Sequence, residues 1–164
     1  MNFLRNVVTI GGLYLLFTLL VYSQQINPLD IVTINHDVHV GRMNKEFVVS
    51  LDIHLAIKKS WHINSHSPND TFLVPTILSF DQSAGYSVSE IIYPPDEHAA
   101  LPFSRTELSL YAGKQTIRAT ITIPQSYRKK RIILNATVHY QACNDQICLF
   151  PVKKTFRIVV LSRK

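Results

Sequence analysis

The two cysteines of the chain, Cys143 and Cys148, lie in one short stretch, Tyr140–Pro151, and carry its clearest potential for chemistry. Two thiols separated by four residues can form a disulfide, join a metal site with outside ligands, or stay free. Because a zinc site needs more ligands at regular spacing and the chain has no second cysteine pair, we do not expect a metal. Whether the two thiols are free or form a disulfide therefore depends on the cellular compartment in which the protein resides.

The N-terminus indicates export. Met1–Arg5 carries positive charge, Val7–Tyr22 is uncharged and mostly apolar, and Val21-Tyr22-Ser23 presents small residues where a signal peptidase cuts. We predict a signal peptide over residues 1–23, with an uncleaved membrane anchor as the alternative, and one domain over residues 24–164. In an exported chain, two cysteines are expected to form one disulfide.

The charge of the chain does not indicate nucleic-acid binding. The net charge is +6, and part of the excess lies in Arg128–Arg131 and Lys153-Lys154. These basic runs are not interleaved with aromatic residues and belong to no known recognition module, so we read them as solvated turns. His62 and His66 lie four residues apart in a predicted loop, where that spacing has no helical meaning, so a metal site is not expected there either.

Apolar and polar residues alternate along most of the remaining chain, as in half-buried strands. The clearest runs are Phe47–Lys58, Ile117–Ile123, Ile132–Gln141 and Phe156–Leu161, and weaker ones are Asp30–Ile34, Thr76–Phe80, Tyr86–Tyr93 and Thr106–Tyr111. No stretch beyond the signal has helical periodicity. The pattern predicts an all-β fold, an immunoglobulin-like antiparallel β-sandwich of roughly seven to nine strands. Residues 59–75 and 94–105 are expected to be long loops that carry function.

The cysteine stretch is predicted to be a hairpin. Cys143 ends one strand, Asn144-Asp145 supplies turn-forming residues, and Cys148 begins the next extended run. A disulfide over so short a loop contributes only about 2 kcal/mol of chain entropy. Its loss should leave the fold standing, as a reversible redox disulfide requires. The same spacing also suits the alternative, a non-catalytic β-sandwich binding or accessory module with a structural disulfide.

Tyr140-Gln141-Ala142-Cys143, followed by Cys148-Leu149-Phe150-Pro151, resembles the N-terminal periplasmic domain of the thiol:disulfide interchange protein DsbD. In that family a Tyr-Gln-x-Cys…Cys-x-x-Pro segment carries the redox pair on an immunoglobulin-like sandwich. The resemblance extends over about residues 30 to 160. Its supporting segments are Trp61–Ser65, Phe72–Thr76, Tyr93-Pro94-Pro95 and Leu110–Gly113.

The resemblance implies a protein-disulfide reductase component that needs no small-molecule cofactor. Such a domain accepts electrons from a membrane-embedded partner through a thioredoxin-like domain, and passes them to exported thiol proteins such as disulfide isomerases or cytochrome c maturation factors. Cys148 is then expected to bridge to partners and Cys143 to resolve the mixed disulfide. Because the chain ends at Lys164 without a multi-span region or a C-x-x-C, we expect the donor to be a thioredoxin-like domain on a separate membrane protein. The domain itself is expected in the periplasm, or anchored in a membrane and facing the periplasm if residues 1–23 are not cleaved.

The family also implies a loop that caps the cysteine pair. Residues 94–103 are the candidate, with Phe103 as the cap residue. Asp96 and Glu97 are then acidic candidates near the thiols, where negative charge would raise a thiol pKa. Tyr140 is predicted by alternation to face inward, close enough in sequence to shield Cys143.

Overall fold

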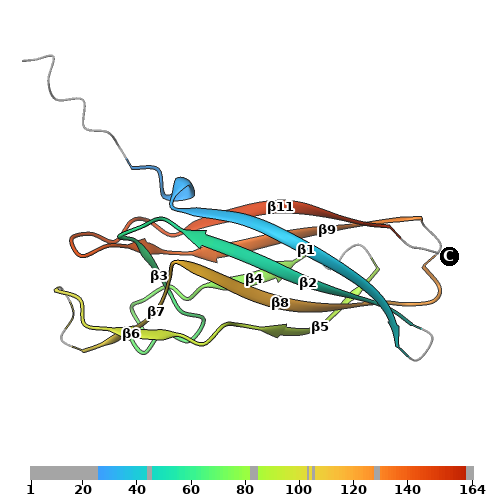
Figure 1. The fold of residues 1–164 in the computed structure, drawn as a ribbon, viewed down its shortest axis with the longest axis horizontal. Coiled ribbons are helices and arrows are strands. Elements are labelled where there is room, and N and C mark those ends of the chain that lie inside the picture. The colour runs from blue at the N-terminus through green and yellow to red at the C-terminus, as the bar shows by residue number, and fades with distance from the viewer. Residues whose placement is uncertain are drawn as a thin grey trace, which may run out of the picture.

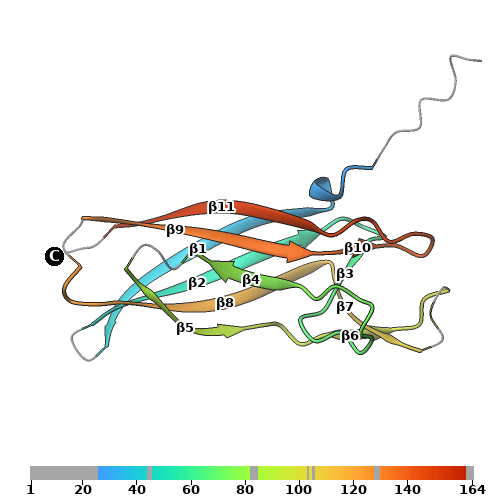
Figure 2. The ribbon, with the colours of Figure 1, turned by 180° about the vertical axis from the view of Figure 1, so that it is seen from behind.

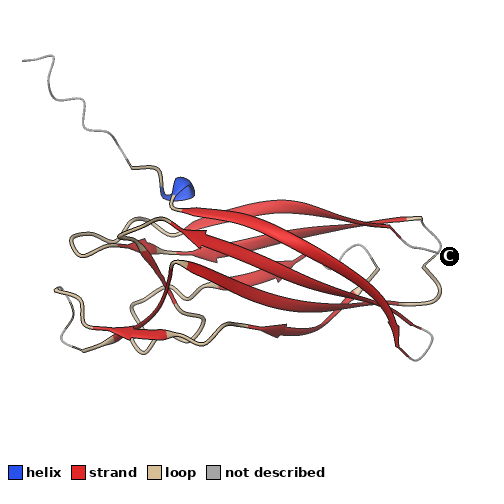
Figure 3. Ribbon diagram, viewed as in Figure 1, coloured by secondary structure: helices blue, strands red, loops and turns tan. Residues whose placement is uncertain are grey.

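The computed structural model describes residues 26–43, 46–81, 85–102, 104, 106–127 and 130–161. Nearly all of the regular structure in these residues is strand, and the exception is the short 3-10 helix η1, Pro28–Asp30 (Figure 3). No helix in this part of the chain is long and apolar enough to cross a membrane. The predicted signal peptide, residues 1–23, lies outside the described residues.

Two antiparallel sheets form the sandwich body. The first has the order β1-β2-β8-β5, made of β1 (Val32–Met43), β2 (Glu46–Ile57), β8 (Lys114–Ile123) and β5 (Ser87–Ile92). The second has the order β11-β9-β4, made of β11 (Val152–Leu161), β9 (Arg131–Tyr140) and β4 (Ile77–Phe80). Their long strands run along the length of the molecule (Figure 1). The fold is therefore an immunoglobulin-like antiparallel sandwich, as the sequence predicts.

A third sheet of short strands lies at one end of the molecule, opposite the end marked C (Figure 1). Its order is β10-β3-β7-β6, made of β10 (Ala142–Cys143), β3 (His62–Asn64), β7 (Leu108–Ala112) and β6 (Glu97–Ala99). Seen from behind, β10 continues from β9 into the cysteine turn at this end (Figure 2). We call this sheet, with residues 65–76 and 144–151, the cysteine end.

The core of the sandwich follows from the alternation in the sequence. The inward positions of three strands are apolar and buried: Val49, Leu51, Ile53, Leu55 and Ile57 of β2, Ile117, Ala119, Ile121 and Ile123 of β8, and Ile132, Leu134, Ala136, Val138 and Tyr140 of β9. Each buried aliphatic side chain contributes about 1.5–3 kcal/mol relative to exposure. Three of the four clearest predicted strands are thereby confirmed, and the fourth, residues 156–161, lies within β11.

Other strands differ from prediction because tertiary pairing defines them. β1 extends to Met43, well beyond the predicted Ile34, because it pairs with β2 along its whole length. Its inward position at His36, stacked on Phe156 at 6.0 Å between ring centroids, interrupts the apolar alternation. β3 and β6 form within segments predicted to be loops, since strands of three residues are too short to show a period.

Candidate functional site

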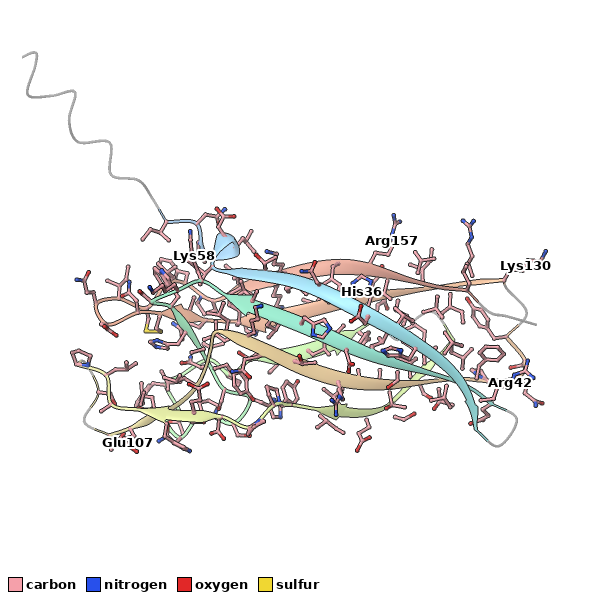
Figure 4. The ribbon with its side chains drawn as sticks, viewed as in Figure 1. His36, Arg42, Lys58, Glu107, Lys130 and Arg157 are labelled. Atoms are coloured by element: carbon pink, nitrogen blue, oxygen red, sulfur yellow. A yellow bond between two sulfur atoms is a disulfide. The ribbon has the colours of Figure 1, made fainter. Side chains whose placement is uncertain are left out.

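The two cysteines are joined to each other in a disulfide at the cysteine end. Their Cα atoms lie 4.0 Å apart, and the two residues face each other as an antiparallel bridge. Figure 4 shows the sulfur–sulfur bond at the end near the labelled Lys58, away from Arg42 and Lys130. Cys143 is only 1% exposed, whereas Cys148 is exposed to solvent. Of the two bonded residues, Cys148 is therefore the one exposed to solvent.

Backbone hydrogen bonds close the cysteine turn independently of the disulfide. The amide of Asn144 donates to the carbonyl of Ile147 at 2.9 Å, and the amide of Leu149 donates to the carbonyl of Ala142 at 2.8 Å. Inside the turn, Oδ1 of Asn144 accepts from the amides of Gln146 and Ile147 at 2.8 and 2.9 Å. The turn consequently has its own support when the sulfur–sulfur bond is broken.

The side chain of Gln141 ties three segments together beside this turn. Its Nε2 donates to the carbonyl of Leu149 at 3.2 Å, just after Cys148. Its Oε1 accepts from Nδ2 of Asn64 at 3.3 Å and from the amide of Val74 at 3.5 Å. Nδ2 of Asn64 also donates to the carbonyl of Val74 at 3.0 Å. Gln141 thus fixes the segment after Cys148 against β3 and residues 72–76, a role that the sequence motif alone does not reveal.

His62 is the direct cross-strand neighbour of Cys143, on β3. Its side chain is buried, and burial lowers the pKa of its imidazole below the ordinary value, while the negative charge of Asp145 acts in the opposite direction. In the sequence, His62 stands out only as a histidine four residues before His66 and as part of the family-like segment Trp61–Ser65. Its position opposite Cys143 is not predictable from the sequence, because the strand that pairs them, β3, is only three residues long.

Tyr140 is fully buried in the core, as alternation predicts. Its hydroxyl donates to the carbonyl of Pro28 at 3.0 Å, and burial, with a smaller effect of Asp30, raises the pKa of Tyr140 to about 12. The hydroxyl therefore anchors η1 to the end of β9. A shielding role toward Cys143 stays a prediction.

The acidic candidates from the predicted cap lie at the far side of the third sheet. Glu97 begins β6, and β3 and β7 lie between β6 and the cysteine strand β10. The carboxylate of Asp96 accepts a hydrogen bond from the Ser109 hydroxyl, which lowers the pKa of Asp96, and lies 3.7 Å from Nε2 of His98. Within the sheet, the structure does not bring Asp96 and Glu97 to the cysteines. Phe103, the predicted cap residue, lies outside the described residues.

Two exposed apolar side chains flank the accessible cysteine. Ile147 precedes Cys148, and Phe150, which is 87% exposed, follows it by two residues. Apolar side chains are therefore exposed on both sides of Cys148 in the sequence.

Comparison with known proteins points to one family. The family described as "Thiol:disulfide interchange protein DsbD, N-terminal" matches residues 38–160. The fold is similar to that of the reduced DsbD n-terminal domain of Neisseria meningitidis, with a TM-score of 0.53 and 11% identity over 84% of this chain and 91% of that chain. It is also similar to the N-terminal periplasmic domain of ScsB from Proteus mirabilis, with a TM-score of 0.56 and 14% identity. That similarity covers 82% of this chain and 49% of the ScsB chain. No curated protein sequence matches the chain.

Proposed function

Because the chain belongs to the family of the N-terminal domain of the thiol:disulfide interchange protein DsbD, we propose that Cys143 and Cys148 cycle between disulfide and dithiol while the domain relays electrons between proteins. The observation that carries this proposal is the unequal exposure of the two bonded cysteines, with Cys148 exposed and Cys143 buried. Exchange proceeds through attack on one sulfur and release of the other. The exposure difference supports Cys148 as the sulfur that is attacked.

Reduction of the domain begins with a thiolate of the donor. It attacks Sγ of Cys148, the sulfur–sulfur bond breaks, and the electron pair leaves on Sγ of Cys143. The donor's second thiolate then attacks the donor sulfur of this mixed disulfide and releases the thiolate of Cys148. The domain now holds two thiols and the donor holds a disulfide, so two electrons have moved.

Delivery to an acceptor runs in the opposite direction. The thiolate of Cys148 attacks the acceptor's disulfide and forms a mixed disulfide, which frees one acceptor thiolate. Sγ of Cys143 then attacks Sγ of Cys148, restores the internal disulfide and releases the second acceptor thiolate. Both states need the same fold, and the hydrogen bonds of the turn, such as that from Leu149 to Ala142, support this requirement.

The proposed relay operates outside the cytoplasm, after export directed by residues 1–23. We propose a thioredoxin-like domain of a membrane protein as the electron donor. The proposed acceptors are exported thiol proteins, including factors of cytochrome c maturation. The exposed side chains of Ile147 and Phe150 beside Cys148 support the proposal that the partners are proteins, because a protein can cover these apolar side chains and a small thiol cannot.

A redox titration of the purified domain tests this proposal. The domain is equilibrated in buffers of graded thiol and disulfide content, free thiols are alkylated with a reagent that adds mass, and the two states are separated by gel. A relay predicts complete reduction at a potential above about −300 mV, with the fold retained. A potential well below that value would identify an inert structural disulfide, and hence the alternative binding module.

Trapping identifies the bridging cysteine. The Cys143→Ser variant is expected to accumulate a mixed disulfide with a thioredoxin-like partner through Cys148. The Cys148→Ser variant is the matched control and should not accumulate one, since Cys143 is buried. Equal trapping by the two variants would contradict the assignment of Cys148.

A further inference from the structure

The thiol that resolves the mixed disulfide is buried, which creates a chemical difficulty. Cys143 is 1% exposed, so the thiolate on its sulfur is poorly solvated in the reduced state. Burial of a thiol in apolar surroundings raises its pKa, and a protonated thiol does not attack a disulfide. Efficient resolution therefore needs a nearby group that removes the proton of the Cys143 thiol.

The sheet register places one such group beside Cys143. Cys143 on β10 pairs directly with His62 on β3. In an antiparallel pair, directly opposed side chains lie on the same face, with their Cβ atoms about 4.5–5.5 Å apart. On the other side of His62, its partner on β7 is Ala112, which leaves room for the imidazole on this face. The side chains of His62 and Cys143 therefore start from directly opposed positions on the same face of the sheet.

We propose that His62 is the proton acceptor that activates the Cys143 thiol for resolution of the mixed disulfide. This inference rests on the proposed exchange function and adds a residue to it. A neutral imidazole offers one unprotonated ring nitrogen. Burial favours that neutral form, because it lowers the pKa of His62. The base is thus ready at neutral pH.

The proton and electrons balance in each direction. In resolution, the proton of the Cys143 thiol moves to the imidazole of His62, and Sγ of Cys143 attacks Sγ of Cys148. A sulfur–sulfur bond forms, the bond to the acceptor breaks, and the acceptor leaves as a thiolate. Water then takes the proton from His62. In reduction, His62 takes up a proton from water and delivers it to Sγ of Cys143 as that sulfur leaves.

Charges around His62 tune this base. Asp145, in the turn between the cysteines, is the charged group that acts on His62 among the described residues. On the segment that precedes β3, Lys58 and Lys59 are the nearest cations in sequence, and both are exposed. The side chain opposite on β7, that of Ala112, does not titrate. Asp145 therefore raises the proton affinity of an imidazole that burial has lowered.

Stopped-flow oxidation of the reduced full domain by dithiodipyridine tests the inference. Attack by Cys148 releases the first thiopyridone, and resolution by Cys143 releases the second. His62→Gln is expected to leave the first phase unchanged and to slow the second at pH 7 by roughly tenfold or more. The second phase of the variant should also rise about tenfold per pH unit and continue to rise beyond the ordinary thiol pKa of about 8.5, because the attacking thiol of Cys143 is buried. In the wild type, the second phase should be nearly independent of pH above about 6.5.

Two further variants keep the result interpretable. His54→Gln changes a histidine of the sandwich body and should leave both phases as in the wild type. Asp145→Asn changes an exposed turn residue, and should move the acid limb of the second phase to lower pH by removing the charge that raises the pKa of His62. An acid limb that stays in place would contradict the role of His62, even if His62→Gln does not fold.

The failures of the two proposals are distinguishable. If the wild-type disulfide resists reduction, the exchange function itself is wrong. If the wild type exchanges and folded His62→Gln has the same pH profile in its second phase, only the role of His62 is overturned. A slower second phase without a changed pH profile would also overturn it, since that result reports on structure alone.

Discussion

The sandwich body and the cysteine end are built from different interactions. In the body, the facing positions of β2, β8 and β9 are filled by aliphatic side chains. At the cysteine end, strands of two to five residues pair with one another, and side-chain hydrogen bonds join this sheet to the neighbouring loops. The buried polar residues of the described chain all lie at this end, and they are His62, Asn64, Ser65, Thr76 and Ser109.

This difference in interactions suggests a different role for each region, with the body providing stability and the cysteine end providing the geometry for exchange. Apolar packing is cooperative and depends little on any one polar contact, so the body can hold the fold while a bond at its end opens and closes. Polar contacts are directional, and an unmet one costs about 1–3 kcal/mol. A network such as Asn64, Gln141 and Val74 therefore fixes geometry more than it adds stability. If this division is right, substitutions in the two regions should separate stability from exchange.

The largest separation is expected from Cys148→Ser. This substitution should abolish exchange, because it removes the exposed sulfur, yet lower the free energy of unfolding by no more than about 2 kcal/mol. Exchange is measured by alkylation after incubation with a thioredoxin-like donor, and stability by guanidinium unfolding. Unfolding of the variant at room temperature would show that the cysteine end is needed to hold the body together.

The opposite result is expected from Leu134→Ala, at a fully buried position of β9. Removal of this side chain leaves a cavity and should lower the free energy of unfolding by about 2–5 kcal/mol. The reduction potential should not change, because the cysteine turn is untouched. Ile133→Ala, at an exposed position on the same strand, is the control and should change stability by less than about 0.5 kcal/mol. A shifted potential in folded Leu134→Ala would show that the two regions are coupled.

Gln141→Leu should affect both properties, with the larger relative effect on exchange. The substitution removes one partner each from the carbonyl of Leu149, the amide of Val74 and the side chain of Asn64, for a loss of about 1–3 kcal/mol. Because the segment after Cys148 is no longer held by the hydrogen bond from Gln141 to Leu149, we also expect a protein thiol to attack Cys148 more slowly. Thr137→Val removes an exposed hydroxyl pair with Thr155 and serves as the control. Wild-type exchange rates in Gln141→Leu would exclude a positioning role.

The same division explains which features the sequence predicts. The strands of the sandwich body can be predicted from the sequence, because burial of one sheet face requires an apolar residue at every second position, as at Leu51, Ile121 and Leu134. The strands of the cysteine end cannot be predicted in this way, since β3, β6 and β10 are too short to show a period and pair with strands that are distant in sequence. The cysteines themselves are found by residue type. Their neighbours His62 and Asn64 become visible only through pairing, and the hydrogen bond from Ser109 to Asp96 likewise depends on a contact between segments that the sequence does not show.

A smaller and more selective effect is expected from Phe150→Ser. Phe150 is exposed, so its removal should not change stability, but partners that cover it should react a fewfold more slowly. Reaction with a small thiol such as dithiothreitol should be unaffected, since it makes no use of the surface beside Cys148. Ile92→Ser, an exposed apolar position on β5, is the control. Equal slowing with protein and small thiols would place the effect in the cysteine turn and not in docking.

The smallest effect is a dependence of stability on pH that originates at the cysteine end. The pKa of His62 is lower in the folded state than its ordinary value of 6.5, because burial disfavours the charged imidazole. As pH falls below about 6.5, the unfolded chain takes up a proton that folded His62 does not, so unfolding becomes more favourable. The contribution of neutral His62 to the free energy of unfolding is complete above about pH 6.5, and it is lost as the pH decreases toward the pKa of His62 in the folded state. Guanidinium unfolding between pH 5 and about 8 should show this slope in the wild type and a reduced slope in His62→Gln. An unchanged slope in folded His62→Gln would show that the acid sensitivity does not originate at His62.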